Sequence, residues 1–206
     1  QVFGGGELEH LRAFGSPIAE GSIKASTDAL TKLRDTYLEK LVGISSGKPF
    51  VTDKLPHNFK LIGLIFSTFP EAKIVHVKRS AAATCWSNYK HYFSVDGLGY
   101  CYDLQDLVRH YQLYENLMEF WDQIYAERIY HLDYDLLTID QETETKRLLK
   151  FLALDWEHAC LSPHNNKRIV RTVSHEQIRQ KIYTGSSEQW RKFKPFLGGA
   201  FDELET

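Results

Sequence analysis

Apolar positions along the chain alternate between short runs rich in β-branched residues and longer stretches with helical spacing. The runs at residues 50–53, 73–78 and 128–134 predict strands, because Val, Ile, Phe and Tyr favour a half-buried pleated surface. Apolar residues three and four positions apart predict helices in the stretches between these runs. Those helices are expected at about residues 28–41, 59–69, 80–91, 103–126 and 140–152.

The ends of the expected helices carry residues that commonly cap helices. The candidate capping residues are Thr27 or Asp28, Ser80, and Thr138 or Asp140. Residues 1–23 are rich in glycine and are predicted to be irregular. The tail at residues 162–206 is polar, and short helical pieces are expected there near 174–180 and 186–193.

Strands that alternate with helices predict an α/β fold of three layers, a mostly parallel sheet with helices on both faces. A length of 206 residues suits a single domain over residues 1–206. In such sheets ligands bind outside the carboxyl ends of the strands, where Lys54 and Arg79 stand. We therefore expect the two cations to face one anionic ligand, the alternative being that each is simply solvated.

Composition narrows the classes of partner. A net charge of −2 argues against bulk electrostatic binding to nucleic acid or to an anionic membrane. No apolar run has the length of a membrane span, and no signal peptide is visible. The three cysteines, Cys85, Cys101 and Cys160, form no CxxC pair and no metal-ligand spacing. Sparse, unpaired cysteines fit a reducing compartment, so we expect a cytoplasmic protein without a metal site.

Several segments, in order, resemble the sulfotransferase family, and most closely its bacterial and tyrosylprotein members. The segments are Gly6-Glu7-Leu8, Val51-Thr-Asp-Lys54-Leu-Pro56, Ala72-Lys-Ile-Val-His-Val-Lys-Arg79 with Ser87 eight residues on, Tyr134-Asp-Leu-Leu137 followed by Arg147 to Trp156, and Val173 to Tyr183 with Trp190-Arg191. The resemblance implies a fold like that of P-loop NTPases. It also implies a donor, 3′-phosphoadenosine 5′-phosphosulfate, whose spent form is adenosine 3′,5′-bisphosphate.

The sequence departs from the family in two places. The family's first strand and its Pro-Arg-Ser-Gly-Thr-Thr loop, which wraps the 5′-phosphosulfate, are not found in these 206 residues. The usual Arg-Asp-Pro is replaced by Arg79-Ser80-Ala81. If the loop does not precede Gln1, half of the donor site is missing and catalysis is in doubt.

The resemblance assigns three residues to catalysis. Glu7 resembles the general base that takes the proton of the acceptor hydroxyl. Lys54 resembles the cation that stabilises charge between the sulfuryl group and the leaving phosphate. Ser174 resembles a hydroxyl donor to the same charge, although Ser174 and Gln177 also have the spacing of a helix capping box. Sulfuryl transfer needs no redox cofactor and no metal ion.

The resemblance assigns a second set of residues to donor binding. Arg79 and Ser87 resemble the pair that binds the 3′-phosphate, and a guanidinium matches phosphate geometry well. His91 and Tyr134 are expected nearby, with Tyr134 at the adenosine phosphate or ring. Arg191 is an alternative phosphate contact. The segment expected to close over the nucleotide is Ser174, Gln177, Ile178, Arg179, Gln180, Lys181, Ile182 and Tyr183.

Two functions from different classes follow. The first is an enzyme that transfers a sulfuryl group to a hydroxyl-bearing acceptor, whether a peptide, a glycan, a lipid or a small molecule. The second is a non-catalytic module that kept the fold and binds a nucleotide or a protein partner. A kinase-like NTPase is a weaker third reading, because it should also contain a phosphate loop with Lys and an acid that binds a metal ion.

Overall fold

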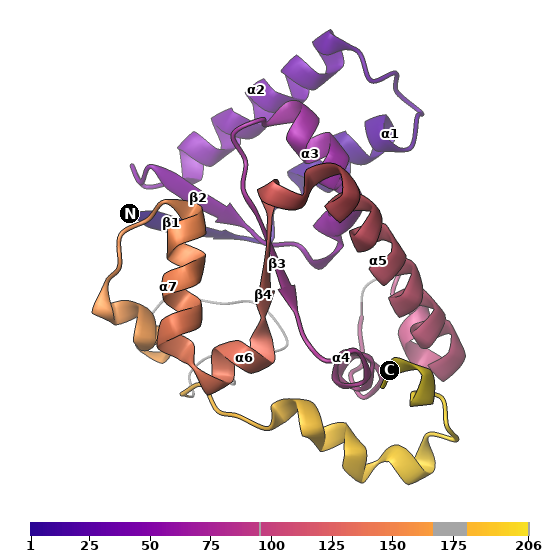
Figure 1. Ribbon diagram of the computed structural model, residues 1–206. Coiled ribbons are helices and arrows are strands. Elements are labelled where there is room, and N and C mark those ends of the chain that lie inside the picture. Colours follow the sequence, from indigo (N-terminus) through magenta and orange to yellow (C-terminus); the bar gives the residue numbers. More distant parts are fainter. Residues whose placement is uncertain (95, 167–180, 206) are drawn as a thin grey trace. The chain divides into compact units, whose positions relative to one another are not determined.

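The computed structural model describes residues 1–94, 96–166 and 181–205. Contacts within the chain divide it into two compact units, residues 1–74 and residues 75–206, and each is described by itself. The expectation of a single domain over the whole length stays a prediction. Figure 1 labels the helices and strands of both units.

The first unit contains a pair of parallel strands and three α-helices (Figure 1). The strands are β1 (Val2–Gly6) and β2 (Phe50–Asp53), and they pair from Val2 opposite Phe50 to Gly6 opposite Asp53. The helical segments are a π-helical turn (Leu11–Gly15), α1 (Ser16–Ala19), α2 (Thr27–Ile44), a 3-10 helix (Pro56–Leu61) and α3 (Ile62–Thr68). The strand predicted at residues 50–53 is confirmed.

The prediction that residues 1–23 are irregular is wrong, because residues 2–6 form β1. Glycine has a low intrinsic preference for strands, but here the close approach of β2 requires a glycine. A Cβ atom on Gly5 would lie 2.8 Å from the carbonyl oxygen of Thr52. Gly6, at the end of β1, has a positive φ of 80° that L-residues rarely adopt. The glycines therefore allow a strand that packs closely and then turns.

The core of the first unit lies where α2, α3 and the residues after β1 meet. Its buried members are Leu8, Leu11, Tyr37, Leu61, Ile65 and Phe69. Helix α2 begins one residue earlier than predicted, since Ser26 is its cap and accepts a hydrogen bond from the Ala29 amide. The helix predicted at 59–69 is instead a 3-10 helix followed by the shorter α3.

The second unit contains the remaining strands and helices (Figure 1). Strand β3 (Ile74–Lys78), whose first residue ends the first unit, pairs with β4 (Ile129–Asp133). The α-helices are α4 (Ala81–Tyr89), α5 (Leu104–Tyr125), α6 (Tyr134–Ile139) and α7 (Gln141–Leu152). Short 3-10 segments include Gly99–Tyr102, Ala126–Arg128, His158–Leu161, Pro163–Asn165, Ser186–Lys192, Lys194–Phe196 and Asp202–Leu204.

Most predicted elements of the second unit are confirmed. Ser80 caps α4 by accepting a hydrogen bond from the Ala83 amide, and Asp140 caps α7. The short helix α6 was not predicted. It forms because Asp133 caps it, accepting hydrogen bonds from the amides of Asp135 and Leu136. The expected helical piece at 174–180 lies outside the described residues.

The core of the second unit joins the C-terminal segment to α4 and α5. Trp190 and Phe201 are both 2% exposed and pack edge to face. They belong to one buried cluster with Ala82, Ala83 and Cys85 of α4. The 3-10 segment Ser186–Lys192 is thereby fixed against α4.

In the described part of the chain the strands form two two-stranded sheets, β1 with β2 and β3 with β4. The α/β character and the parallel pairing of β1 and β2 agree with the predicted class. The three-layer arrangement around one sheet stays a prediction. None of the described helices combines the length and apolar character needed to cross a membrane.

Candidate functional site

Glu7 and Lys54 lie side by side in the first unit. Glu7 directly follows β1 and Lys54 directly follows β2, so both stand at the carboxyl ends of parallel strands. The Lys54 amide donates to the Gly6 carbonyl over 2.8 Å, which extends the strand pairing to this point. The Lys54 ammonium forms an ion pair with the Glu7 carboxylate. The side chains are 39% (Glu7) and 61% (Lys54) exposed, so a substrate in solution can reach them.

A half-buried carboxylate, Asp53, fixes the backbone around this pair. Its two oxygens accept hydrogen bonds from the Leu8 amide, over 3.1 Å, and from the Tyr37 hydroxyl, over 2.8 Å. The pKa of Asp53 is raised, because the effect of burial is larger than that of the two hydrogen bonds, which lower it. Because Leu8 follows Glu7 and Asp53 precedes Lys54, these hydrogen bonds fix the backbone next to both Glu7 and Lys54. Sequence reasoning missed Asp53, and only its position at the end of a predicted strand, directly before Lys54, could have indicated it.

Arg79 and Tyr134 lie together in the second unit. Arg79 stands between β3 and the capping residue of α4, and Tyr134 stands between β4 and the body of α6. The guanidinium carbon of Arg79 lies 5.5 Å from the centre of the Tyr134 ring, a cation–π contact. The structure therefore brings together two residues that the sequence assigned to donor binding.

Two further residues, Ser187 and Asp135, complete the surroundings of Arg79, and neither was predicted. The Arg79 Nε donates to the Ser187 hydroxyl over 2.8 Å, and that hydroxyl donates to Asp135 Oδ1. The second oxygen of Asp135 accepts a longer hydrogen bond of 3.4 Å from the Ser80 amide. Ser187 is only 5% exposed.

Ser87 and His91 lie at the far end of α4 from Arg79. Ser87 is in the last turn of the helix, and His91 follows it. The His91 ring donates from Nδ1 to the backbone carbonyl of Ser87 over 2.5 Å, which holds the ring against the helix end. Both side chains are half-buried.

The predicted closing segment is described only in part. Ser174, Gln177, Ile178, Arg179 and Gln180 lie outside the described residues, so their roles stay predictions. Lys181, Ile182 and Tyr183 are in irregular structure, with Lys181 and Tyr183 exposed.

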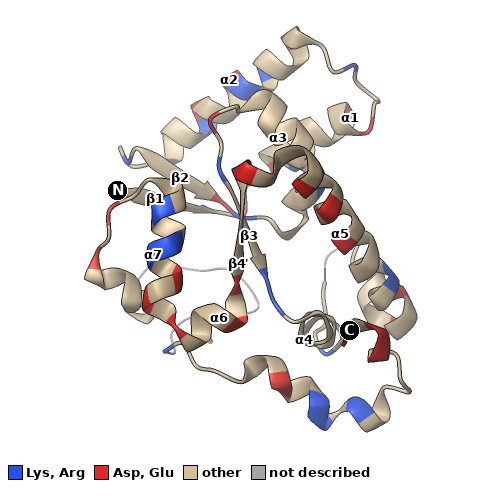
Figure 2. Ribbon diagram, in the orientation of Figure 1, with Lys and Arg blue, Asp and Glu red and all other residues tan. Residues whose placement is uncertain are grey.

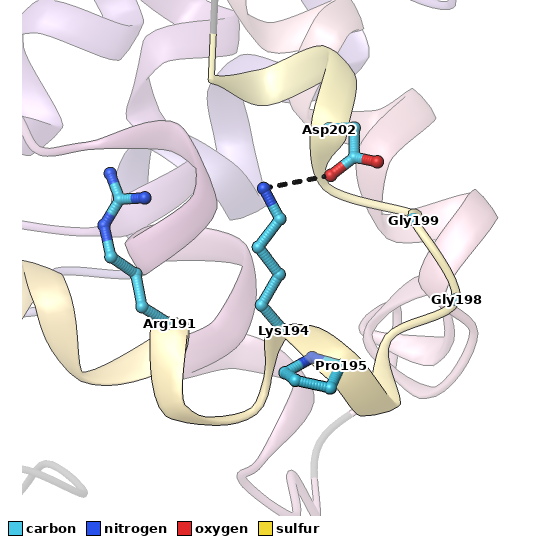
Figure 3. Close-up of a pocket in the computed structure, with 6 residues that line it drawn as sticks. All are labelled: Arg191, Lys194, Pro195, Gly198, Gly199 and Asp202. Atoms are coloured by element: carbon cyan, nitrogen blue, oxygen red, sulfur yellow. Dashed lines mark ion pairs between the residues drawn. The ribbon is translucent and has the colours of Figure 1, made fainter.

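Arg191 lies on the 3-10 segment Ser186–Lys192, where it pairs with two carboxylates, Glu188 and Glu205. It lines an open pocket together with Lys194, Pro195, Gly198, Gly199 and Asp202 (Figure 3). Lys194 is paired across this pocket with Asp202, at 3.2 Å. The alternative role of Arg191 as a phosphate contact stays a prediction. Within the described ranges, no three His, Cys, Asp or Glu side chains converge as metal ligands would.

Comparison with known proteins identifies the family to which the chain belongs. The model of the sulfotransferase family matches residues 11–158, well over half of the chain. The chain is also 36% identical over 171 residues to an uncharacterised protein of Aquifex aeolicus strain VF5. That alignment covers 82% of this chain and 22% of the Aquifex protein, so the chain spans about a fifth of its relative's length. The chain belongs to the sulfotransferase family.

Proposed function

We propose that this domain transfers a sulfuryl group from 3′-phosphoadenosine 5′-phosphosulfate to a hydroxyl group of an acceptor. The observation that carries the proposal is the Glu7–Lys54 pair at the carboxyl ends of parallel strands, in a chain of the sulfotransferase family. Sulfuryl transfer needs a base for the acceptor hydroxyl and a cation for the charge that develops on the leaving phosphate. A carboxylate beside an ammonium group supplies both.

In the proposed reaction, Glu7 accepts the proton of the acceptor hydroxyl as its oxygen forms a bond to sulfur. The bond between sulfur and the bridging phosphate oxygen breaks, and the electron pair stays on the leaving bisphosphate. Lys54 stabilises that developing negative charge. Without substrates, the two side chains neutralise each other, and the network of Asp53 keeps them in place.

In the second unit, Arg79 is proposed to bind the 3′-phosphate of the donor. Its guanidinium offers planar donors that match phosphate oxygens. Tyr134, in contact with Arg79, is proposed to reach the adenosine phosphate or ring, and Ser87 and His91 to add polar contacts. The acceptor is a hydroxyl-bearing peptide, glycan, lipid or small molecule, and the reaction uses no metal ion.

The test is transfer of radiolabelled sulfate from the donor, with the full-length protein and a panel of tyrosine peptides, glycans, lipids and phenols. Lys54→Ala should lower the transfer rate about 10²–10³-fold, as the loss of a preorganised transition-state charge does in other enzymes. The matched control is Lys60→Ala, which removes an exposed lysine from the following 3-10 helix and should leave the rate unchanged.

Each outcome is informative. A Lys54→Ala variant that transfers sulfate at the wild-type rate contradicts the role given to Lys54. Binding of adenosine 3′,5′-bisphosphate without transfer to any member of the panel would instead favour a non-catalytic nucleotide-binding module.

A further inference from the structure

The hydrogen bonds around Arg79 form a chain in which each group has one possible role. A guanidinium can only donate, so the Ser187 oxygen accepts from Arg79 Nε at 2.8 Å. The single proton of Ser187 is then directed at Asp135, whose carboxylate can only accept. Because Ser187 is 5% exposed, little water can compete for either bond. The orientation of the Arg79 side chain is therefore determined by Ser187 and Asp135.

The three linked residues come from separate segments whose positions are fixed independently. Arg79 directly follows β3, and Ser187 is the second residue of the segment Ser186–Lys192. Asp135 is held in the first turn of α6, where its amide donates a hydrogen bond of 2.8 Å to Asp133. Trp190, three residues after Ser187, is buried in the cluster that includes α4. The position of Ser187 is thus fixed by the packing of Trp190 in the buried core.

The hydrogen bond to Ser187 uses only one nitrogen of the Arg79 guanidinium. Nε is bound to Ser187, and the Tyr134 ring lies beside the guanidinium carbon at 5.5 Å. The two terminal nitrogens of Arg79 have no hydrogen-bond partner among the described residues. Those two nitrogens are the ones that form a fork for two oxygens of a phosphate group. Fixing the side chain before binding avoids the ordering cost that binding would otherwise incur.

We propose that Ser187 and Asp135 are positioning residues that hold Arg79 in the orientation that receives a 3′-phosphate. This inference rests on the proposed function, because it takes the ligand of Arg79 to be a nucleotide with a 3′-phosphate. It predicts that Ser187 and Asp135 contribute to the preference for 3′-phosphorylated nucleotides without touching them.

The test is calorimetric binding of adenosine 3′,5′-bisphosphate and of adenosine 5′-monophosphate, which lacks the 3′-phosphate. Ser187→Ala should weaken binding of the bisphosphate about tenfold, the effect of losing one ordered contact. It should leave binding of the monophosphate within about twofold. The matched control is Ser186→Ala, because the Ser186 hydroxyl has no hydrogen-bond partner among the described residues.

Two more variants separate positioning from a purely structural role. Asp135→Asn keeps an oxygen that can accept from Ser187, so bisphosphate affinity should stay near that of the wild type, whereas Asp135→Ala should weaken it as Ser187→Ala does. In an Arg79→Ala background, Ser187→Ala should cause no further loss, because there is no guanidinium left to position. If Ser187→Ala does not fold, comparison of Asp135→Asn with Asp135→Ala provides the same test.

The outcomes distinguish this inference from the proposed function. If Arg79→Ala weakens bisphosphate binding but Ser187→Ala and Asp135→Ala do not, the positioning role is wrong and the proposed function stands. The positioning role is also wrong if Ser187→Ala weakens both nucleotides equally, or adds its full effect to that of Arg79→Ala. If the wild-type protein does not bind the bisphosphate at all, the proposed function fails and the inference fails with it.

Discussion

Acidification below pH 6.5 is expected to destabilise the protein through His76. This residue of β3 lies between His131 of β4 and Tyr114 of α5, with 2.9 Å between the Nδ1 atoms of the two histidines. His131 donates from Nε2 to the carboxylate of Asp122, over 2.9 Å. A neutral His131 must then accept at Nδ1, so His76 donates from Nδ1 and accepts from the Tyr114 hydroxyl at Nε2. This set of hydrogen bonds requires a neutral His76, because a protonated ring could not accept at Nε2.

The size of the effect follows from the pKa of His76. Burial is the main cause that lowers this pKa, from 6.5 to about 4, and electrostatic interactions with His131 and Lys78 lower it further. The carboxylate of Asp122 raises the pKa of His76. Asp122 is one of several acidic residues spaced along the C-terminal half of α5 (Figure 2). The unfolded chain binds a proton as the pH falls through 6.5, but the folded chain does so only near 4. Stability is therefore lost as the pH falls between these values.

Between pH 7 and pH 5 the loss would be about 2 kcal/mol if His76 were shielded from solvent. Since His76 is only half-buried, screening reduces the expected loss to about 1 kcal/mol. Urea denaturation at pH 7 and at pH 5 measures it, with wild type and His76→Gln compared. Glutamine keeps a hydrogen-bonding group but does not titrate, so the variant should lose about 1 kcal/mol less than wild type.

His158→Gln is the control, because His158 is an exposed histidine on a short 3-10 segment, and it should follow the wild type. Burial also raises the pKa values of Asp53 and Glu115, but both residues are present in every variant and cancel in the comparison. If His76→Gln loses as much stability as wild type between pH 7 and pH 5, the reasoning about the histidine pair is refuted.

Two further predictions concern the hydrogen bonds and charges of the candidate site. Tyr37→Phe removes the hydroxyl that donates to Asp53, so the free energy of unfolding measured in urea should fall by about 1–3 kcal/mol; an unchanged value would contradict the role of this network. Arg79→Ala should weaken binding of adenosine 3′,5′-bisphosphate more than Lys54→Ala does, because Lys54 is assigned mainly to the transition state. Calorimetry on both variants checks this, and equal or reversed losses would show that the division of roles is wrong.

Elements with strong local signals could be predicted from the sequence. Ser80 before α4, Asp140 before α7 and the β-branched residues of β3 each determine structure through neighbours in the chain. Strand β1 could not be predicted, because its glycines favour a strand only when β2 lies against them. A tertiary contact overrode local propensity there.

The same distinction holds for the site. Glu7, Lys54, Arg79 and Tyr134 were found because each follows a strand or matches a motif, and the structure places them in two pairs, Glu7 with Lys54 and Arg79 with Tyr134. Ser187 was missed because its partner Arg79 lies 108 positions away in the sequence. Nothing local to a serine in a polar segment indicates that it holds an arginine in place.

The most direct test of the central claim, that Glu7 is the base of a sulfuryl transfer, is the transfer rate of Glu7→Gln. The full-length variant is assayed with labelled donor and an acceptor from the panel, beside Glu9→Gln, which changes a nearby exposed glutamate paired with Arg12. The Glu7 variant should bind adenosine 3′,5′-bisphosphate normally and transfer sulfate about 10²–10⁴-fold more slowly, while the Glu9 variant matches wild type. Transfer by Glu7→Gln at the wild-type rate would contradict the account.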